Sequence, residues 1–137
     1  MGGHVIAGSE IELTVAADRA AACEARHAVA GCGLVGAAQE PTLLLLVSEL
    51  VSNSVRHAGL GDDERIRVRA HTDDDCARIE VCDGGRSGQV PAKRQQHDVL
   101  EPGGLGLVLV DEMADRWGVH RRDHETCVWF ELACAGG

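Results

Sequence analysis

The sequence predicts an α+β protein, a two-layer α/β sandwich in which a mixed, largely antiparallel sheet carries three helices on one face. Five segments alternate polar and apolar residues in the manner of half-buried strands, and three segments are apolar at helical spacing. The expected order, β-α-α-β-β-α-β-β, lacks the regular alternation of a doubly wound parallel sheet. The 137 residues, of which 45% are hydrophobic, suit one domain, residues 1–137, with one core.

The N-terminal half begins with a strand and continues with two helices. The run EIELTVA, residues 10–16, alternates and is expected to be the first strand. Asp18 is expected to cap the first helix, which Gly31 and Gly33 are expected to stop. The second helix should begin after Pro41 and end at Gly59, because proline favours the first turn of a helix and glycine favours its C-terminal cap.

The C-terminal half contains two pairs of strands with a helix between them. RIRVRAH and ARIEVCD alternate and are separated by TDDD, a pattern that predicts a β-hairpin. Residues 84–104 are rich in Gly, Pro and polar residues and show no periodicity, and long loops of this kind are often functional lids. A third helix is expected over residues 105–117, and the last two strands are expected near residues 118–122 and 126–132.

Charge and hydropathy exclude several classes of partner. Thirteen Lys and Arg residues against 22 Asp and Glu residues give a net charge of −9, and no basic cluster is large enough for a phosphate backbone. We therefore expect no nucleic-acid partner. No stretch approaches the roughly 20 apolar residues that span a bilayer, and MGGHVIAGSEIE lacks the pattern of a signal peptide. The expected location is the cytoplasm, without a membrane partner.

Six cysteines are spread through the chain with no C-x-x-C pair. In a cytoplasmic protein we expect them to be free thiols that pack as small apolar groups. A zinc site is the alternative, because His120 and His124 have ligand spacing and Cys127 is near them in sequence. The paired cysteines that make such a pattern specific are missing, so the free-thiol interpretation is preferred.

Polar residues recur on the second helix, which is otherwise strongly apolar. Glu49, Asn53 and His57 are four residues apart, so their side chains line one face of the helix. A carboxylate, a carboxamide and an imidazole are costly to bury without partners. Either they are hydrogen-bonded inside the protein, or they face a cleft and offer a general base, an oxygen ligand for a hard cation and a donor to phosphate.

Two further places combine polar groups with glycine. Asp83 ends a strand and is followed by Gly84 and Gly85; its carboxylate can cap a turn or accept hydrogen bonds from a planar ligand. Gly104 and Gly106 stand at the start of the third helix, where free backbone N–H groups and the helix dipole favour an anion. Glycines at a helix start can also serve close packing alone.

The order and spacing of these motifs resemble a known superfamily. The pattern E-L-V-x-N-S-x-x-H-A, followed by D-x-G and then by G-x-G-L before a helix, is similar to that of the GHKL ATPases. The match is nearest to the small anti-sigma-factor serine kinases of bacteria, and it runs from the first strand to VWFEL. The resemblance implies the Bergerat ATP-binding fold, with ATP and Mg²⁺ as cofactors and with residues 84–104 as the ATP lid.

The resemblance assigns the phosphate end of the site to the second helix. It implies that Glu49 activates the attacking hydroxyl or water and that Asn53 coordinates Mg²⁺. Arg56 and His57 match positions that lie close to the phosphates in the family.

The resemblance also assigns the adenine end. Asp83 matches the Asp that reads the adenine amino group, and Gly85 matches the glycine of D-x-G, although Gly88 comes one residue late for the longer motif. Thr126 falls where the family has a threonine near the adenine pocket, although Glu125 replaces the preceding glycine. The second glycine box at the end of the lid matches Gly104, Leu105, Gly106 and Leu107.

The function implied by the resemblance is that of an ATP-dependent serine/threonine protein kinase and anti-sigma factor. The implied partners are a sigma factor and a STAS-type anti-anti-sigma protein that carries the acceptor serine, and a homodimer is expected. The second hypothesis is an ATP-binding module of the same fold without kinase activity, against which the presence of Glu49 argues. A catalytic fragment of a histidine kinase is a third hypothesis, disfavoured because no helix with a phosphorylatable histidine precedes the first expected strand.

Overall fold

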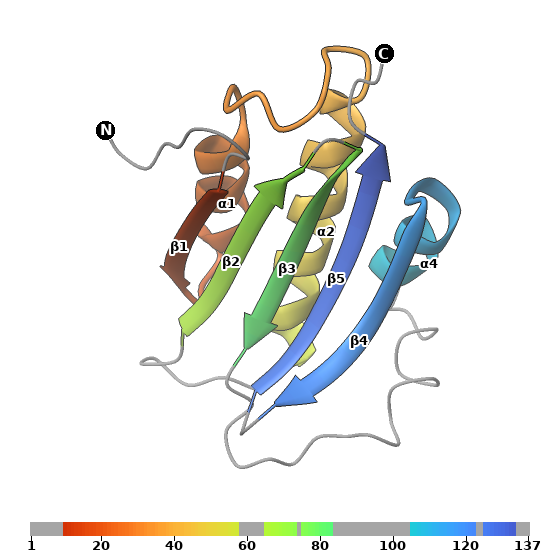
Figure 1. The fold of residues 1–137 in the computed structure, drawn as a ribbon. Helices are drawn as coiled ribbons and strands as arrows, with labels where there is room; N and C mark the ends of the chain where they lie inside the picture. Colours follow the sequence, from red (N-terminus) through yellow and green to blue (C-terminus); the bar gives the residue numbers. More distant parts are fainter. Residues whose placement is uncertain (1–9, 58–64, 74, 84–104, 123–124, 134–137) are drawn as a thin grey trace.

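A computed structural model of the chain describes residues 10–57, 65–73, 75–83, 105–122 and 125–133. Within these ranges, five strands and three helices follow one another in the order that the sequence predicts (Figure 1). The strands are β1 (Glu10–Ala16), β2 (Arg65–Thr72), β3 (Cys76–Asp83), β4 (Arg116–Arg122) and β5 (Glu125–Ala133). The helices are α1 (Ala21–Val29), α2 (Glu40–His57) and α4 (Leu105–Met113).

The described strands form one sheet in the order β1-β2-β3-β5-β4, and each neighbouring pair is antiparallel. The described helices lie together on one face of this sheet, behind it in Figure 1. Helix α2 packs against β2 and β3 in the centre, α1 packs against α2 and β1, and α4 packs against α2 and β4. The predicted α+β fold class is confirmed.

Strand alternation divides the sheet into a helix-covered face and an open face. On β3, Ala77, Ile79 and Val81 are buried beneath the helices, whereas Arg78 and Glu80 are half-buried on the open face. The side of α2 that meets the sheet consists of apolar residues that are at most 1% exposed: Leu43, Leu46, Val47, Leu50 and Val51. Burial of each such side chain contributes roughly 1.5–3 kcal/mol. No helix in the described part of the chain is long and apolar enough to cross a membrane.

Hydrogen bonds hold the connection between α1 and α2 in place. Helix α2 begins at Glu40, with Pro41 in its first turn, slightly earlier than predicted. The Glu40 carboxylate accepts a hydrogen bond from the N–H of Gly31 at 2.8 Å. Gly31 has a φ of 77°, which glycine adopts without strain. The amide of Gln39 donates to the carbonyl of Ala133 at 2.9 Å, which joins the start of α2 to the end of β5.

Two further predicted helix boundaries are wrong. Helix α1 begins later than predicted, because the Asp18 carboxylate accepts a hydrogen bond from the N–H of Ala20 at 2.9 Å and forms a turn before the helix. Helix α4 ends at Met113 rather than at residue 117. Trp117 instead pairs with Phe130 across β4 and β5, and its ring packs against the core.

The predicted hairpin between β2 and β3 is confirmed. The Asp73 carboxylate accepts hydrogen bonds from the N–H of Cys76 at 2.9 Å and from the N–H of Asp75 at 2.8 Å, which closes the turn. These bonds favour the ionised form and therefore lower the pKa of the Asp73 carboxyl. The hairpin sets the register that places Asp83 at the far end of β3 opposite Ile66.

The expectation that every cysteine is a free thiol is wrong for two of them. Cys82 on β3 and Cys127 on β5 are directly opposite each other and form a disulfide, with their Cα atoms 4.0 Å apart. Among the described residues, Cys23 and Cys32 are free thiols, and both are exposed. The disulfide therefore adds a covalent link between two strands that already share a hydrogen-bond ladder.

The ring of Trp129 on β5 lies close to the backbone of Gly118 on β4, on the open face of the sheet. A Cβ atom on Gly118 would lie 2.9 Å from the ring of Trp129, which is the residue opposite it in the register. The guanidinium carbon of Arg78 lies 4.0 Å from the centroid of the same ring, within the range of a cation–π contact. Gly118 is thus required by the position of the indole ring.

We expect Gly118→Ala to lower the free energy of unfolding by about 1–3 kcal/mol, because the added methyl group must displace the ring of Trp129. Urea denaturation followed by circular dichroism measures this change. In a Trp129→Leu background the same substitution should cost less than about 0.5 kcal/mol. An equal cost in both backgrounds would show that the ring contact is not the cause.

Candidate functional site

Glu49 and Asn53 stand on the border between the buried side and the exposed side of α2. Both residues are half-buried, whereas their neighbours Leu50 and Val51 are at most 1% exposed. The apolar stripe fixes the rotation of the helix against the sheet, so the two polar side chains occupy the margin of the helix–sheet interface. Arg56, one turn further along, is exposed.

Asn53 holds a buried oxygen atom that lacks a donor. Its Oδ1 atom has no hydrogen-bond partner among the residues that the structure describes. A buried acceptor in this state costs about 1–3 kcal/mol, and most buried polar atoms in proteins are satisfied. A carboxamide oxygen is also a ligand that hard cations such as Mg²⁺ accept. The environment of Asn53 therefore fits the metal-ligand role that the resemblance implies.

Asp83 and Thr126 face each other across β3 and β5. Asp83 comes two residues after the buried Val81, so it projects from the helix-covered face, and Thr126 projects from the same face. Both side chains are half-buried. The structure thus brings together the two residues that the resemblance assigns to the adenine end.

The amino end of α4 is formed by part of the predicted second glycine box. Leu105, Gly106 and Leu107 make up the first turn, where backbone N–H groups have no partner within the helix. The side chain of Leu107 is 5% exposed and belongs to the core, so this residue can meet a ligand only through its backbone. Free N–H groups at the positive end of the helix dipole suit an anion.

The elements that carry these residues end on the same side of the molecule. Figure 1 shows the carboxyl ends of α2 and β3 and the amino end of β5 at the lower edge of the sheet. Helix α2, which carries Asn53, packs against both the strand that ends at Asp83 and the helix that begins at Leu105.

Part of the predicted site lies outside the described residues. This holds for Gly85 and Gly104, for the predicted lid over residues 84–104, and for Gly59, the expected cap of the second helix. His57 is the last residue of α2, and its side chain is likewise outside the described part. The predicted contacts of these residues remain predictions.

The two cysteines of the disulfide are sequence neighbours of the two residues of the predicted adenine end. Cys82 directly precedes Asp83, and Cys127 directly follows Thr126. In antiparallel strands, a register that sets Asp83 opposite Thr126 also sets Cys82 opposite Cys127. Because successive side chains alternate, the disulfide lies on the open face, behind the two residues of the predicted adenine end.

The family relationship follows from comparison with known proteins. The family described as the histidine kinase-like ATPase domain matches residues 12–132 of the chain. The chain belongs to the histidine kinase-like ATPase family. The matched region includes α2, the end of β3 and the start of α4, which are the elements that carry the candidate site.

Curated relatives of this histidine kinase-like ATPase domain include serine-protein kinases named RsbW from Listeria. The proteins of Listeria innocua serovar 6a and Listeria monocytogenes serotype 4a are each 31% identical to the chain, and that of Listeria monocytogenes serovar 1/2a is 34% identical. Each match covers 53% of this chain and 53% of the relative. The chain thus spans about half the length of the curated relatives it matches.

We expect Asn53→Leu to raise the free energy of unfolding by about 1–2 kcal/mol in the absence of nucleotide and Mg²⁺, because it removes the buried oxygen that lacks a donor. Urea denaturation measures the change. Ser54→Leu, also half-buried on α2, controls for the better helix propensity of leucine. A gain in Asn53→Leu no larger than that in the control would mean that the Asn53 oxygen is already satisfied.

Proposed function

We propose that this domain binds ATP together with Mg²⁺ and is a serine/threonine protein kinase that acts as an anti-sigma factor. The proposal rests chiefly on the buried Oδ1 atom of Asn53, which lacks a donor among the described residues and lies one helical turn from Glu49. Membership of the histidine kinase-like ATPase family supports ATP as the nucleotide. The name serine-protein kinase, which the relatives carry, supports transfer to a serine.

Recognition of adenine is assigned to Asp83. An ionised carboxylate only accepts hydrogen bonds, and adenine presents an amino group, so the contact is charge-assisted and selects against a base with a carbonyl at that position. Thr126, opposite Asp83 in the register, adds a hydroxyl that both donates and accepts. Gly85 has no side chain that would obstruct a flat ring.

Binding of the phosphates is assigned to α4 and to the end of α2. The backbone N–H groups at Gly104, Leu105 and Gly106 are the anion-binding groups, aided by the dipole of α4. Arg56 and His57 are the side chains on α2 that add positive charge or donors. The adenine contacts are thus assigned to β3 and β5, and the phosphate contacts to α2 and α4.

Asn53 is the residue that would hold Mg²⁺, with phosphate oxygens and water as the remaining ligands. Bound there, the ion would neutralise part of the charge of the phosphates. Glu49 is half-buried on the same side of α2 and acts as the general base. The hydroxyl of the acceptor serine gives its proton to the Glu49 carboxylate while its oxygen bonds to the terminal phosphorus, and ADP leaves.

The acceptor is proposed to be a serine of a STAS-type anti-anti-sigma protein, and a sigma factor is the second partner. Both assignments follow from the resemblance to anti-sigma-factor serine kinases, as do a homodimeric state and a cytoplasmic location. Direct contact with nucleic acid is not part of the proposal, because the net charge of −9 opposes it.

We expect Asp83→Asn to lower the affinity for ATP by about 100-fold, because the charged acceptor is lost and an amide donor faces the adenine amino group. Isothermal titration calorimetry with ATP and Mg²⁺ measures the affinity. Asp75→Asn makes the same chemical change in the turn at the other end of β3 and should leave the affinity unchanged. Equal affinities of the two variants would refute the assignment of Asp83.

We expect Glu49→Ala to retain ATP affinity within about twofold and to lower the rate of transfer by about 10²–10⁴-fold, because only the general base is lost. The assay combines the protein, γ-labelled ATP, Mg²⁺ and a STAS-type partner, and phosphoserine is the product measured. Glu24→Ala, an exposed glutamate on α1, is the matched control. If the native chain binds ATP but yields no phosphoserine, the domain is the nucleotide-binding module of the second hypothesis.

A further inference from the structure

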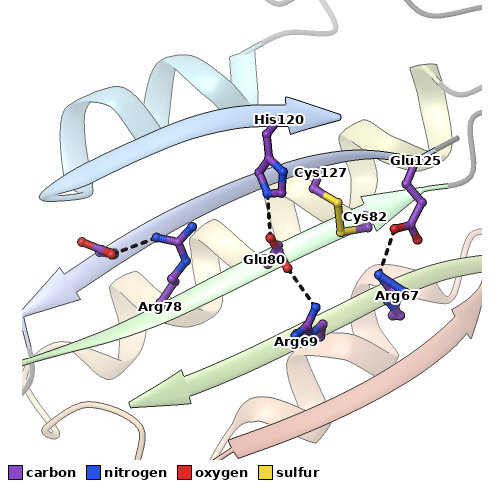
Figure 2. A network of polar contacts seen from close by, with 9 residues as sticks. Arg67, Arg69, Arg78, Glu80, Cys82, His120, Glu125 and Cys127 are labelled. Carbon is purple, nitrogen blue, oxygen red and sulfur yellow. Dashed lines mark hydrogen bonds and ion pairs between the residues drawn. A yellow bond between two sulfur atoms is a disulfide. The ribbon is translucent and has the colours of Figure 1, made fainter. Parts of the chain in front are cut away.

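The open face of the sheet carries a compact set of metal-ligating side chains around the disulfide (Figure 2). One ligand atom each from Glu80, Cys82 and Cys127 lies within 4.8 Å of the others. The Nε2 atom of His120 lies 2.8 Å from an Oε atom of Glu80, and the register sets His120 directly opposite Cys127. The four side chains come from three adjacent strands, so the sheet itself holds them together.

This set differs from the zinc site considered from the sequence. Of that site, His120 and Cys127 are brought together, whereas His124 lies outside the described residues. The second sulfur comes from Cys82, which is 45 residues away in the chain and adjacent only through the pairing of β3 with β5. No short spacing motif contains this set of ligands.

The burial of the set favours a metal over a solvated cluster of polar groups. Cys82 and Cys127 are at most 1% exposed, and the side chain of Glu80 is 12% exposed. The side chain of His120 is 37% exposed, which leaves one side of the set open to solvent. Two sulfurs, an imidazole and a carboxylate are the donor types that tetrahedral Zn²⁺ takes in proteins.

A neighbouring ion pair orients one of the ligands, Glu80. Arg69 lies 3.4 Å from the other carboxylate oxygen of Glu80, which leaves the first oxygen directed at His120. On the opposite side of the disulfide, Arg67 is paired with Glu125 at 2.9 Å (Figure 2). The contact between Arg69 and Glu80 is of the kind that fixes the orientation of a metal ligand and raises metal affinity.

We propose that reduction of the Cys82–Cys127 disulfide by a dithiol creates a Zn²⁺ site whose ligands are Cys82, Cys127, His120 and Glu80. In the reduction, the S–S bond of the protein breaks, both sulfurs gain a hydrogen, and the dithiol becomes a cyclic disulfide. Binding of Zn²⁺ then releases the two thiol protons to solvent. The oxidised form has no thiolate and therefore lacks the site, so disulfide and metal are alternative links between β3 and β5.

The test uses the full chain with its four other cysteines replaced by serine, at positions Cys23, Cys32, Cys76 and Cys134. The protein is reduced with a dithiol, separated from it under anaerobic conditions, and titrated with Co²⁺, a spectroscopic substitute for Zn²⁺. We expect one equivalent to bind, with a thiolate-to-cobalt charge-transfer band and the visible bands of tetrahedral cobalt. Addition of Zn²⁺ should abolish these bands, and the oxidised protein should show none.

Variants separate this site from adventitious binding by thiols. His120→Ala keeps both cysteines and should lower Co²⁺ affinity by about 10–100-fold. His71→Ala removes an exposed histidine of β2 on the same face and should change nothing. The proposal is overturned if the reduced protein binds no stoichiometric cobalt, if the oxidised protein binds it equally, or if His120→Ala binds as tightly as the native sequence. None of these readouts depends on nucleotide binding or kinase activity.

Discussion

The rotation of α2 about its own axis is the constraint on which the candidate site depends. Five residues of this helix are almost completely buried against the sheet, and at roughly 1.5–3 kcal/mol each they dominate its position. The Asn53 oxygen, which has no donor among the described residues, costs about 1–3 kcal/mol, and this packing outweighs that cost. The helix therefore keeps an orientation in which Glu49 and Asn53 stand at the margin of the interface.

The second constraint is the alternation of side chains along β3 and β5. Asp83 and Thr126 project towards the helices, and the adjacent Cys82 and Cys127 project to the open face. Two short stretches of backbone thus serve two different chemistries, one on each side of the sheet. This arrangement also explains why the open face is rich in ion pairs: it has no described helix to bury apolar side chains, and charged residues occupy it.

Much of the fold was predictable from the sequence because half-buried strands impose strict alternation. The bounds of β1 match the prediction, and those of β2 and β3 differ from it by one residue at one end. Helix ends were less predictable, since Asp18 can close a turn as readily as it caps a helix, and Trp117 gains more from pairing with Phe130 than from another helical turn. A local sequence pattern does not contain contacts between residues that are distant in the chain.

The candidate site likewise has features that the sequence predicts and features that depend on tertiary packing. The types and spacing of Glu49, Asn53 and Asp83 sufficed to predict a site, but the buried state of the Asn53 oxygen depends on packing that no local pattern contains. Compartment and cysteine spacing do not predict the disulfide, because it depends on the strand register that sets Cys82 opposite Cys127.

Register has a mechanical consequence as well. A covalent link between Cys82 and Cys127 holds their Cα atoms 4.0 Å apart. Asp83 directly follows Cys82 on β3, and Thr126 directly precedes Cys127 on β5, so these two residues form the neighbouring pair of the ladder. A link that fixes one residue pair of a ladder also restricts the neighbouring pair, because on each strand a planar, stiff peptide bond joins the residue of one pair to the residue of the next. The separation of Asp83 from Thr126 is therefore set partly by chemistry on the opposite face of the sheet.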